Sequence, residues 1–129
     1  MLKNQSNNSL SIENIVKATY IGGHKAFPKQ KHTKVAIYHD RLEILELNLS
    51  IPYSFMKNIE NMEDKKISKL RVVALGPIIG VLWKKKVLYT VITCNDGIDE
   101  QTIVLDLGKG VDSIQPLIYQ KMLLAKKLL

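Results

Sequence analysis

The C-terminal end of this chain constrains its fold most, because it is the longest stretch with a helical repeat of apolar residues. Residues 112–129 place an apolar side chain every three or four positions, with polar side chains largely between them. This stripe comprises Ile114, Leu117, Ile118, Met122, Ala125 and Leu129. Asp112 or Ser113 is predicted to cap the helix, which would place Pro116 within its first turn. Since everything before it looks like short strands, one helix has to cover a β core.

The preceding segments have the residue preferences of β-strands. The predicted strands are residues 15–21, 34–38, 41–47, 51–53, 56–62, 87–94 and 100–107. Gly22-Gly23 ends the first of them, and residues 24–34 are predicted to be a loop. His39-Asp40 is short enough for a hairpin turn, and residues 95–97 (Asn-Asp-Gly) predict another. Pro52 suits a sheet edge or the entry to a strand.

Between the fifth and sixth predicted strands, residues 63–83 leave alternatives open. Ile67, Leu70 and Ala74 recur at helical spacing, but residues 71–74 also fit a strand. Residues 72–83 are all apolar, Gly or Pro, which is too short a run to cross a bilayer, since a spanning helix needs about 20 residues. This run therefore predicts either a buried connection or a membrane-facing loop next to a lysine cluster.

A chain of 129 residues is expected to form one domain, here residues 15–129 behind a disordered polar tail at residues 1–14. The tail lacks the apolar run of a signal peptide. Cys94 is the single cysteine, so no intrachain disulfide can form, and a cytoplasmic location is expected. We expect Cys94 to be a small packed residue and not a reactive thiol.

The net charge of +7 is unevenly distributed along the chain. Residues 1–40 contain six lysines and two acidic residues, and residues 63–86 contain seven basic and two acidic residues. An acidic block, residues 87–112, follows them. Two basic blocks attract anionic partners, although a basic balance is often only a solvated face.

Motifs that carry catalysis are absent from the sequence, which contains no GxSxG, HExxH, GxxxxGKS/T or CxxC pattern. His24, His32 and His39 are spaced unlike zinc ligands. Residues 108–110 (Gly-Lys-Gly) are only a weak anion-site signal. The aromatic residues do not interleave with the basic ones as a nucleic-acid stacking platform requires. The sequence therefore predicts a protein that is not an enzyme, with no metal, cofactor or specific nucleic acid.

The order of six or seven short strands and one helix resembles the bacterial and archaeal pleckstrin-homology-like, GRAM-related domains, over about residues 17–128. The resemblance is carried by Tyr20-Ile21-Gly22-Gly23-His24, Ile37-Tyr38-His39-Asp40-Arg41-Leu42-Glu43-Ile44, Ile51-Pro52-Tyr53-Ser54, Ile59-Glu60, Lys84-Lys85-Lys86 leading into Tyr89-Thr90-Val91-Ile92, and the terminal helix. It implies a mainly β fold of strongly bent antiparallel sheets, or a partly open barrel, capped by the helix. It also implies a binding or assembly role without catalytic activity.

In the eukaryotic lipid-binding pleckstrin-homology domains, basic residues of the first inter-strand loop hold inositol phosphates. The matching residues here are Lys25, Lys29, Lys31, His32 and Lys34, and a second basic group is Lys84, Lys85 and Lys86. Since the loop has no Arg, bidentate phosphate clamping is missing, and looser attraction is expected. We expect a module that attaches peripherally, at the inner membrane face, to anionic lipid or another polyanion. The alternative is a protein-interaction or self-assembly module that uses a sheet edge or residues 72–83.

Overall fold

The computed structural model describes residues 12–63, 67, 88–95 and 97–127, and it shows a mainly β fold with a C-terminal helix. The elements, with η for a 3₁₀ turn, are β1 (Ile12–Gly22), β2 (Lys31–Tyr38), β3 (Arg41–Ile44), η1 (Leu45–Leu47), β4 (Leu49–Pro52), η2 (Tyr53–Phe55), β5 (Met56–Glu63), β6 (Leu88–Asn95), β7 (Glu100–Asp106), η3 (Gly108–Gly110) and α4 (Val111–Lys127). The predicted fold class is therefore confirmed. Most of residues 63–87, including the lysines at 84–86, lie outside the described part.

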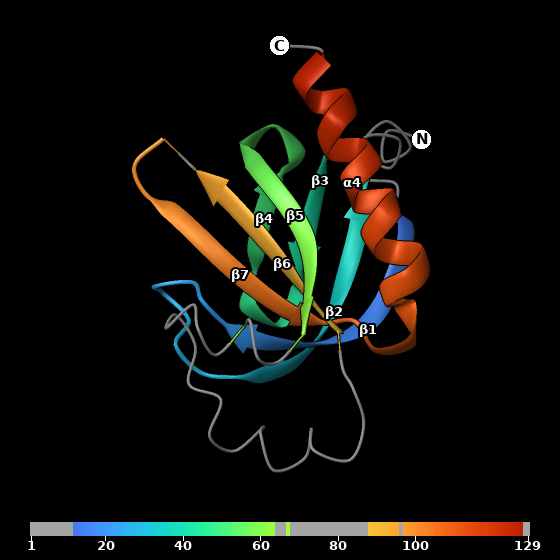
Figure 1. Cartoon of the computed structure of the whole chain (residues 1–129). Coiled ribbons are helices and arrows are strands. Elements are labelled where there is room, and N and C mark those ends of the chain that lie inside the picture. Colours follow the sequence, from blue (N-terminus) through green and yellow to red (C-terminus); the bar gives the residue numbers. More distant parts are fainter. Residues whose placement is uncertain (1–11, 64–66, 68–87, 96, 128–129) are drawn as a thin grey trace, which may run out of the picture.

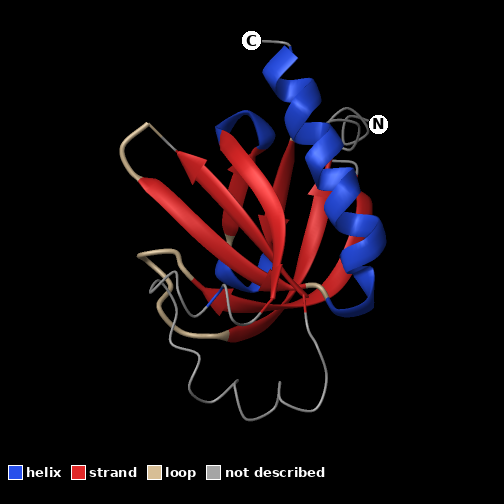
Figure 2. Ribbon diagram, in the orientation of Figure 1, coloured by secondary structure: helices blue, strands red, loops and turns tan. Residues whose placement is uncertain are grey.

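The strands form one antiparallel sheet in the order β4-β3-β2-β1-β7-β6-β5. β4 and β5 are the two edges of this sheet, yet only the three residues of η2 join them along the chain. Three residues reach about 10 Å when extended, so the sheet must bend until its two edges approach each other. α4 packs against η2, β5 and β6 (Figures 1 and 2).

The main core lies between the inner face of this bent sheet and the buried stripe of α4. Alternate residues of the central strands point into it, as Val35 and Ile37 of β2 and Ile103 and Leu105 of β7 show. From α4, the predicted stripe residues Ile114, Ile118 and Met122 are buried, and Leu117 and Ala125 pack partly against the core. The predicted inward positions Leu42 and Ile44 of β3 are buried as well. Cys94 is also buried in this core, as expected.

The opposite, outer face of the sheet is buried over only part of its width. Val91 and Val104 are cross-strand partners on β6 and β7, and both are buried although neither belongs to the main core cluster. Tyr89 and Ile21 alternate with core residues in the same way, and Ile67 is fully buried too. On the β1–β2 half, by contrast, Lys17, His32 and Lys34 are exposed. The outer face is therefore open where β1 and β2 pair.

Several strand boundaries differ from those that the sequence predicts. β1 begins at Ile12, so the last three residues of the predicted tail belong to a strand. β2 begins at Lys31, which shortens the predicted loop at residues 24–34. The third strand ends at Ile44 because the chain turns through η1 into Asn48, which has a positive φ of 52°. Asn tolerates this left-handed conformation better than most residues.

A bulge explains why buried and exposed residues do not alternate strictly along β5. Met56 and Ile59 are both buried although they are three positions apart, which a regular strand would not allow. The pairing of β5 with β6 shifts register between Met56 and Asn58. The extra residue at this bulge turns Ile59 back toward the core.

The final helix begins one residue before its predicted start near residue 112, but the predicted N-cap was wrong. α4 begins at Val111, directly after η3, so Asp112 and Ser113 lie inside the first turn and do not act as its N-cap. Pro116 therefore falls in the second turn, where its missing N–H leaves the carbonyl of Asp112 without its helical partner. Burial of the apolar stripe compensates for this local cost, because packing dominates helix stability in a folded domain.

An ion pair fixes α4 to the first strand. Lys121 Nζ lies 2.6 Å from Glu13 Oε1, and the lysine side chain is mostly buried. His39 Nδ1 lies 3.8 Å from the other oxygen of the same carboxylate. The hydrogen bond from Lys121 is the main cause that lowers the pKa of Glu13 below its usual range. The start of β1, the β2–β3 turn and the helix therefore meet at one carboxylate.

Candidate anion-binding site

The lysines predicted from the first inter-strand loop do not form a single cluster. Lys25 lies in the loop, where its ammonium group is 3.5 Å from Asp99 Oδ1 and its backbone N–H donates to Gln101 Oε1 at 3.1 Å. These contacts hold the loop against β7 and partly neutralise Lys25. Lys29 is exposed in the same loop, and Lys31 is the exposed first residue of β2.

Strand parity separates Lys31 from Lys34. Along β2, Lys31 alternates in phase with buried Thr33 and Val35, whereas Lys34 shares the outer side with His32. Lys34 therefore belongs to the open outer face, and Lys31 lies at the rim where the strand begins. Of the predicted loop residues, Lys34 and His32 lie on this face, and Lys34 is the only lysine among them that does.

The structure adds Lys17, which sequence analysis missed. Lys17 of β1 is the direct cross-strand partner of Lys34, and Thr19 is the partner of His32. Like charges opposite each other destabilise a sheet. Within residues 12–63, 67, 88–95 and 97–127, neither lysine has a carboxylate within 4.0 Å. Two neighbouring cations therefore face outward without a protein counter-ion in that part of the chain.

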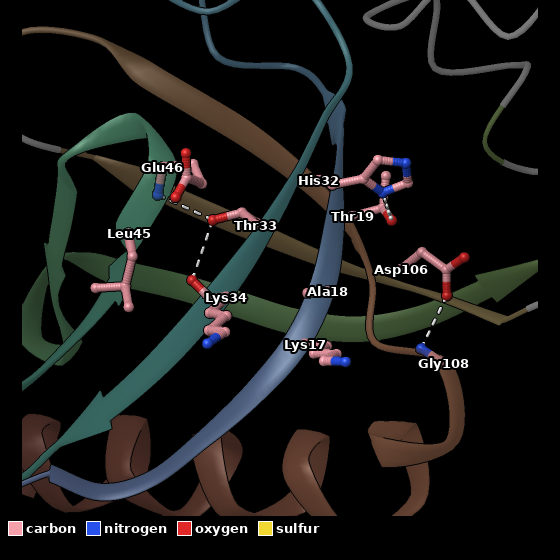
Figure 3. Close-up of a pocket in the computed structure, with 10 residues that line it drawn as sticks. All are labelled: Lys17, Ala18, Thr19, His32, Thr33, Lys34, Leu45, Glu46, Asp106 and Gly108. Carbon is pink, nitrogen blue, oxygen red and sulfur yellow. Dashed lines mark hydrogen bonds between the residues drawn. The ribbon is translucent and has the colours of Figure 1, made fainter.

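A hollow with a volume of about 700 Å³ lies over this lysine pair (Figure 3). It crosses β1 and β2 and extends to η1 on one side and to the end of β7 on the other. Its lining residues are Lys17, Ala18, Thr19, His32, Thr33, Lys34, Leu45, Glu46, Asp106 and Gly108. We call this hollow the β1–β2 hollow.

Hydrogen bonds to the backbone fix both ends of the β1–β2 hollow. On the β7 side, Asp106 Oδ1 accepts the N–H of Gly108 at 2.9 Å. On the η1 side, Thr33 Oγ1 accepts the N–H of Glu46 at 3.0 Å and donates to the carbonyl of Lys34 at 3.1 Å. These bonds hold two carboxylate-bearing residues at opposite ends of the hollow (Figure 3).

Histidine and threonine lie together in the β1–β2 hollow. His32 Nδ1 is 3.2 Å from Thr19 Oγ1, within hydrogen-bonding distance. A hydroxyl nucleophile would need this imidazole to be oriented by a third group. Among the described residues, His32 makes no ion pair with a carboxylate. His32 and Thr19 therefore supply hydrogen-bonding groups to the hollow.

A second hollow, of about 510 Å³, lies beside α4. Tyr53, Leu124 and Ala125 contribute apolar surface to it, and its charged and polar lining residues are His39, Asp40, Ser54, Lys121 and Lys127. The neighbouring outer side of the helix exposes Tyr119 and Leu123. The exposed apolar surface at this hollow is therefore contributed by the outer side of α4.

Comparisons with known proteins give no further information about this site, and neither do the lengths of the helices. No protein-family model matches the chain, and no curated protein matches it in sequence. Among the helices of the described residues, none combines the length and the apolar character needed to cross a membrane.

Proposed function

We propose that this protein is a non-catalytic binding module that attaches peripherally to an anionic phospholipid surface through the outer face of β1 and β2. The observation that carries the proposal is the cross-strand pair of Lys17 and Lys34, two cations without a counter-ion among the described residues. An anionic ligand above the pair would relieve their repulsion. The resemblance to pleckstrin-homology-like domains, which are usually binding or assembly modules, supports the same class of function.

The expected strength of attachment follows from the number of accessible cations. Lys17 and Lys34 face outward from the sheet, Lys29 is exposed in the adjoining loop, and Lys31 is exposed at the rim where β2 begins. Each basic residue near an anionic surface contributes about 1 kcal/mol, and the attraction decays over a Debye length of about 8 Å at physiological salt. Four such residues contribute about 4 kcal/mol in total, which corresponds to millimolar attachment that weakens as salt is added.

Co-sedimentation with vesicles tests the proposal. The protein should bind vesicles that contain an anionic phospholipid and should leave neutral phosphatidylcholine vesicles unbound. The double substitution Lys17→Glu with Lys34→Glu should weaken binding by at least about tenfold, because attraction is replaced by repulsion. The matched control is Lys126→Glu with Lys127→Glu, which changes the net charge equally at exposed positions at the end of α4.

The control variant shows whether the β1–β2 face or the total charge of the protein determines attachment. If both double variants lose binding equally, total charge and not the β1–β2 face controls attachment, and the proposal is wrong. If the unsubstituted protein does not bind anionic vesicles at low salt, membrane attachment is wrong altogether.

The second candidate function is self-assembly through the outer side of α4. Leu124 is 60% exposed, and Tyr119 and Leu123 are each 42% exposed. Contiguous exposed apolar side chains on a helix are typical of interaction surfaces. If this surface joins two copies, light scattering should show a mass that rises with protein concentration and persists in high salt. Leu124→Lys should then restore the monomer, whereas Gln30→Lys, at an exposed position of the loop before β2, should not. A monomer at all concentrations would exclude self-assembly.

A further inference from the structure

We infer that the β1–β2 hollow recognises a phosphate ester that also carries a primary amine, such as the phosphoethanolamine headgroup. The inference rests on the proposed function, since it names the ligand of the same face. Its basis is the charge pattern of the hollow, which contains carboxylates as well as lysines.

Two parallel rows of side chains cross the strands in the hollow. The first row is the pair of Lys34 on β2 and Lys17 on β1. The second row is His32 on β2, Thr19 on β1 and Asp106 on β7, because Thr19 pairs with both of the others. Asp106 is therefore a diagonal neighbour of Lys17, because it lies on the adjacent strand β7 and in the next row. Diagonal neighbours in a sheet lie roughly 7–8 Å apart, within reach of one small ligand.

The carboxylates argue against a ligand that carries only negative charge. Glu46 lies at the η1 end of the hollow and Asp106 at the β7 end, with both lysines between them (Figure 3). In the described part of the chain, neither carboxylate pairs with a lysine within 4.0 Å. A highly charged inositol phosphate would meet like charges at both ends, and such contacts are unfavourable.

A ligand with both charges matches the lysine pair and the carboxylate of Asp106. Its phosphate oxygens would lie over the ammonium groups of Lys17 and Lys34, and its own ammonium group would donate to Asp106. A primary ammonium has three N–H donors, whereas the quaternary ammonium of choline has none. Charge-assisted hydrogen bonds are about twice as strong as neutral ones, so the site should prefer ethanolamine over choline esters.

Asp106→Asn separates the charge of Asp106 from its structural contact. The amide oxygen of Asn can still accept the N–H of Gly108, which the carboxylate accepts at 2.9 Å. The substitution therefore removes a negative charge from the hollow while keeping the turn into η3. Asp112→Asn is the matched control, because Asp112 is an exposed acid in the first turn of α4 and does not line the hollow.

The experiment is a titration with three soluble probes, in which binding is monitored through the NMR chemical shifts of Lys17, Thr19 and Lys34. The probes are glycerophosphoethanolamine, glycerophosphocholine and glycerol 3-phosphate. The unsubstituted protein should bind the ethanolamine ester about tenfold more tightly than the choline ester, a factor that corresponds to one charge-assisted hydrogen bond. Asp106→Asn should abolish this preference and should bind glycerol 3-phosphate more tightly, whereas Asp112→Asn should change neither.

A vesicle series then distinguishes a lipid headgroup from a free ester. Vesicles of equal anionic lipid content should bind more protein when the remaining lipid is phosphatidylethanolamine than when it is phosphatidylcholine. If only the soluble ethanolamine ester is preferred, the ligand is a free amino-phosphate.

The outcomes separate this inference from the proposed function. If Asp106→Asn raises the affinity for all three probes by the same factor, the hollow is an ordinary anion site. The proposed amine specificity is then wrong, while membrane attachment stands. If neither anionic vesicles nor any probe bind, both proposals are wrong together.

Discussion

Ile118→Asp should leave the protein without a cooperative thermal transition, because the substitution places a carboxylate in the centre of the helix–sheet interface. Ile118 has 0% of its surface exposed and belongs to the main core cluster. Truncating a buried Ile to Ala already costs about 2–5 kcal/mol, and a buried, unpaired charge costs several more. Domains of this kind are stabilised by only about 5–15 kcal/mol in total. A circular-dichroism melt of the purified variant measures the result.

The location of the charge, and not its presence on the helix, should cause this loss. Gln120→Asp introduces the same side chain two residues away at an exposed position of α4 and should cost less than about 1 kcal/mol. An Ile118→Asp protein with an unchanged melt would mean that α4 does not cover the core, and the fold described above would be wrong.

Most of the fold could be predicted because its signals are local. The final helix follows from a run of apolar residues at helical spacing, and the structure buries Ile114, Ile118 and Met122 as predicted. The hairpin of β6 and β7 follows from two strand-like runs around an Asn-Asp-Gly turn, and its residues pair in continuous register. Each of these features is determined within about 20 residues of sequence.

Features that depend on the register between two strands, and not on the residue preferences of one segment, could not be predicted. The bulge between Met56 and Asn58 is defined by pairing with β6, which follows more than 25 residues later. The start of β2 at Lys31 is defined in the same way, because Lys31 pairs with Tyr20 of β1. A polar, lysine-rich segment has low intrinsic strand preference, so only its neighbour indicates that it is a strand.

The candidate site shows the same division. Lys34 could be predicted from the basic character of its segment, but Lys17 belongs to a different strand and joins the site only through the β1–β2 register. Asp106 enters it through the further pairing of β1 with β7. A correct register between the first two strands would have identified Lys17, since aligning Tyr20 with Lys31 places Lys17 opposite Lys34.

Gly23→Ala should lower the free energy of unfolding by roughly 2–6 kcal/mol, because two separate penalties act at this position. Gly23 has a φ of +108°, a conformation that side-chain-bearing residues rarely adopt. A Cβ atom there would also overlap the carbonyl oxygen of Thr102 and lie 2.9 Å from its carbonyl carbon. Neither backbone atom can move without displacing β7, so the chain leaving β1 would have to move away. Chemical denaturation of the variant and the unsubstituted protein measures the difference.

Gly97→Ala isolates the conformational penalty from the steric one. Gly97 has a similar φ of +95°, but an added Cβ would meet nothing within 4 Å. Its replacement should therefore cost only the backbone strain, about 1–3 kcal/mol, and leave β7 in place. Gly23→Ala should in addition weaken the hydrogen bond from the N–H of Lys25 to Gln101, which ties the loop to β7. Equal destabilisation by the two substitutions would show that β1 and β7 are not in close contact at Gly23, and would contradict the strand arrangement that brings Asp106 beside Thr19.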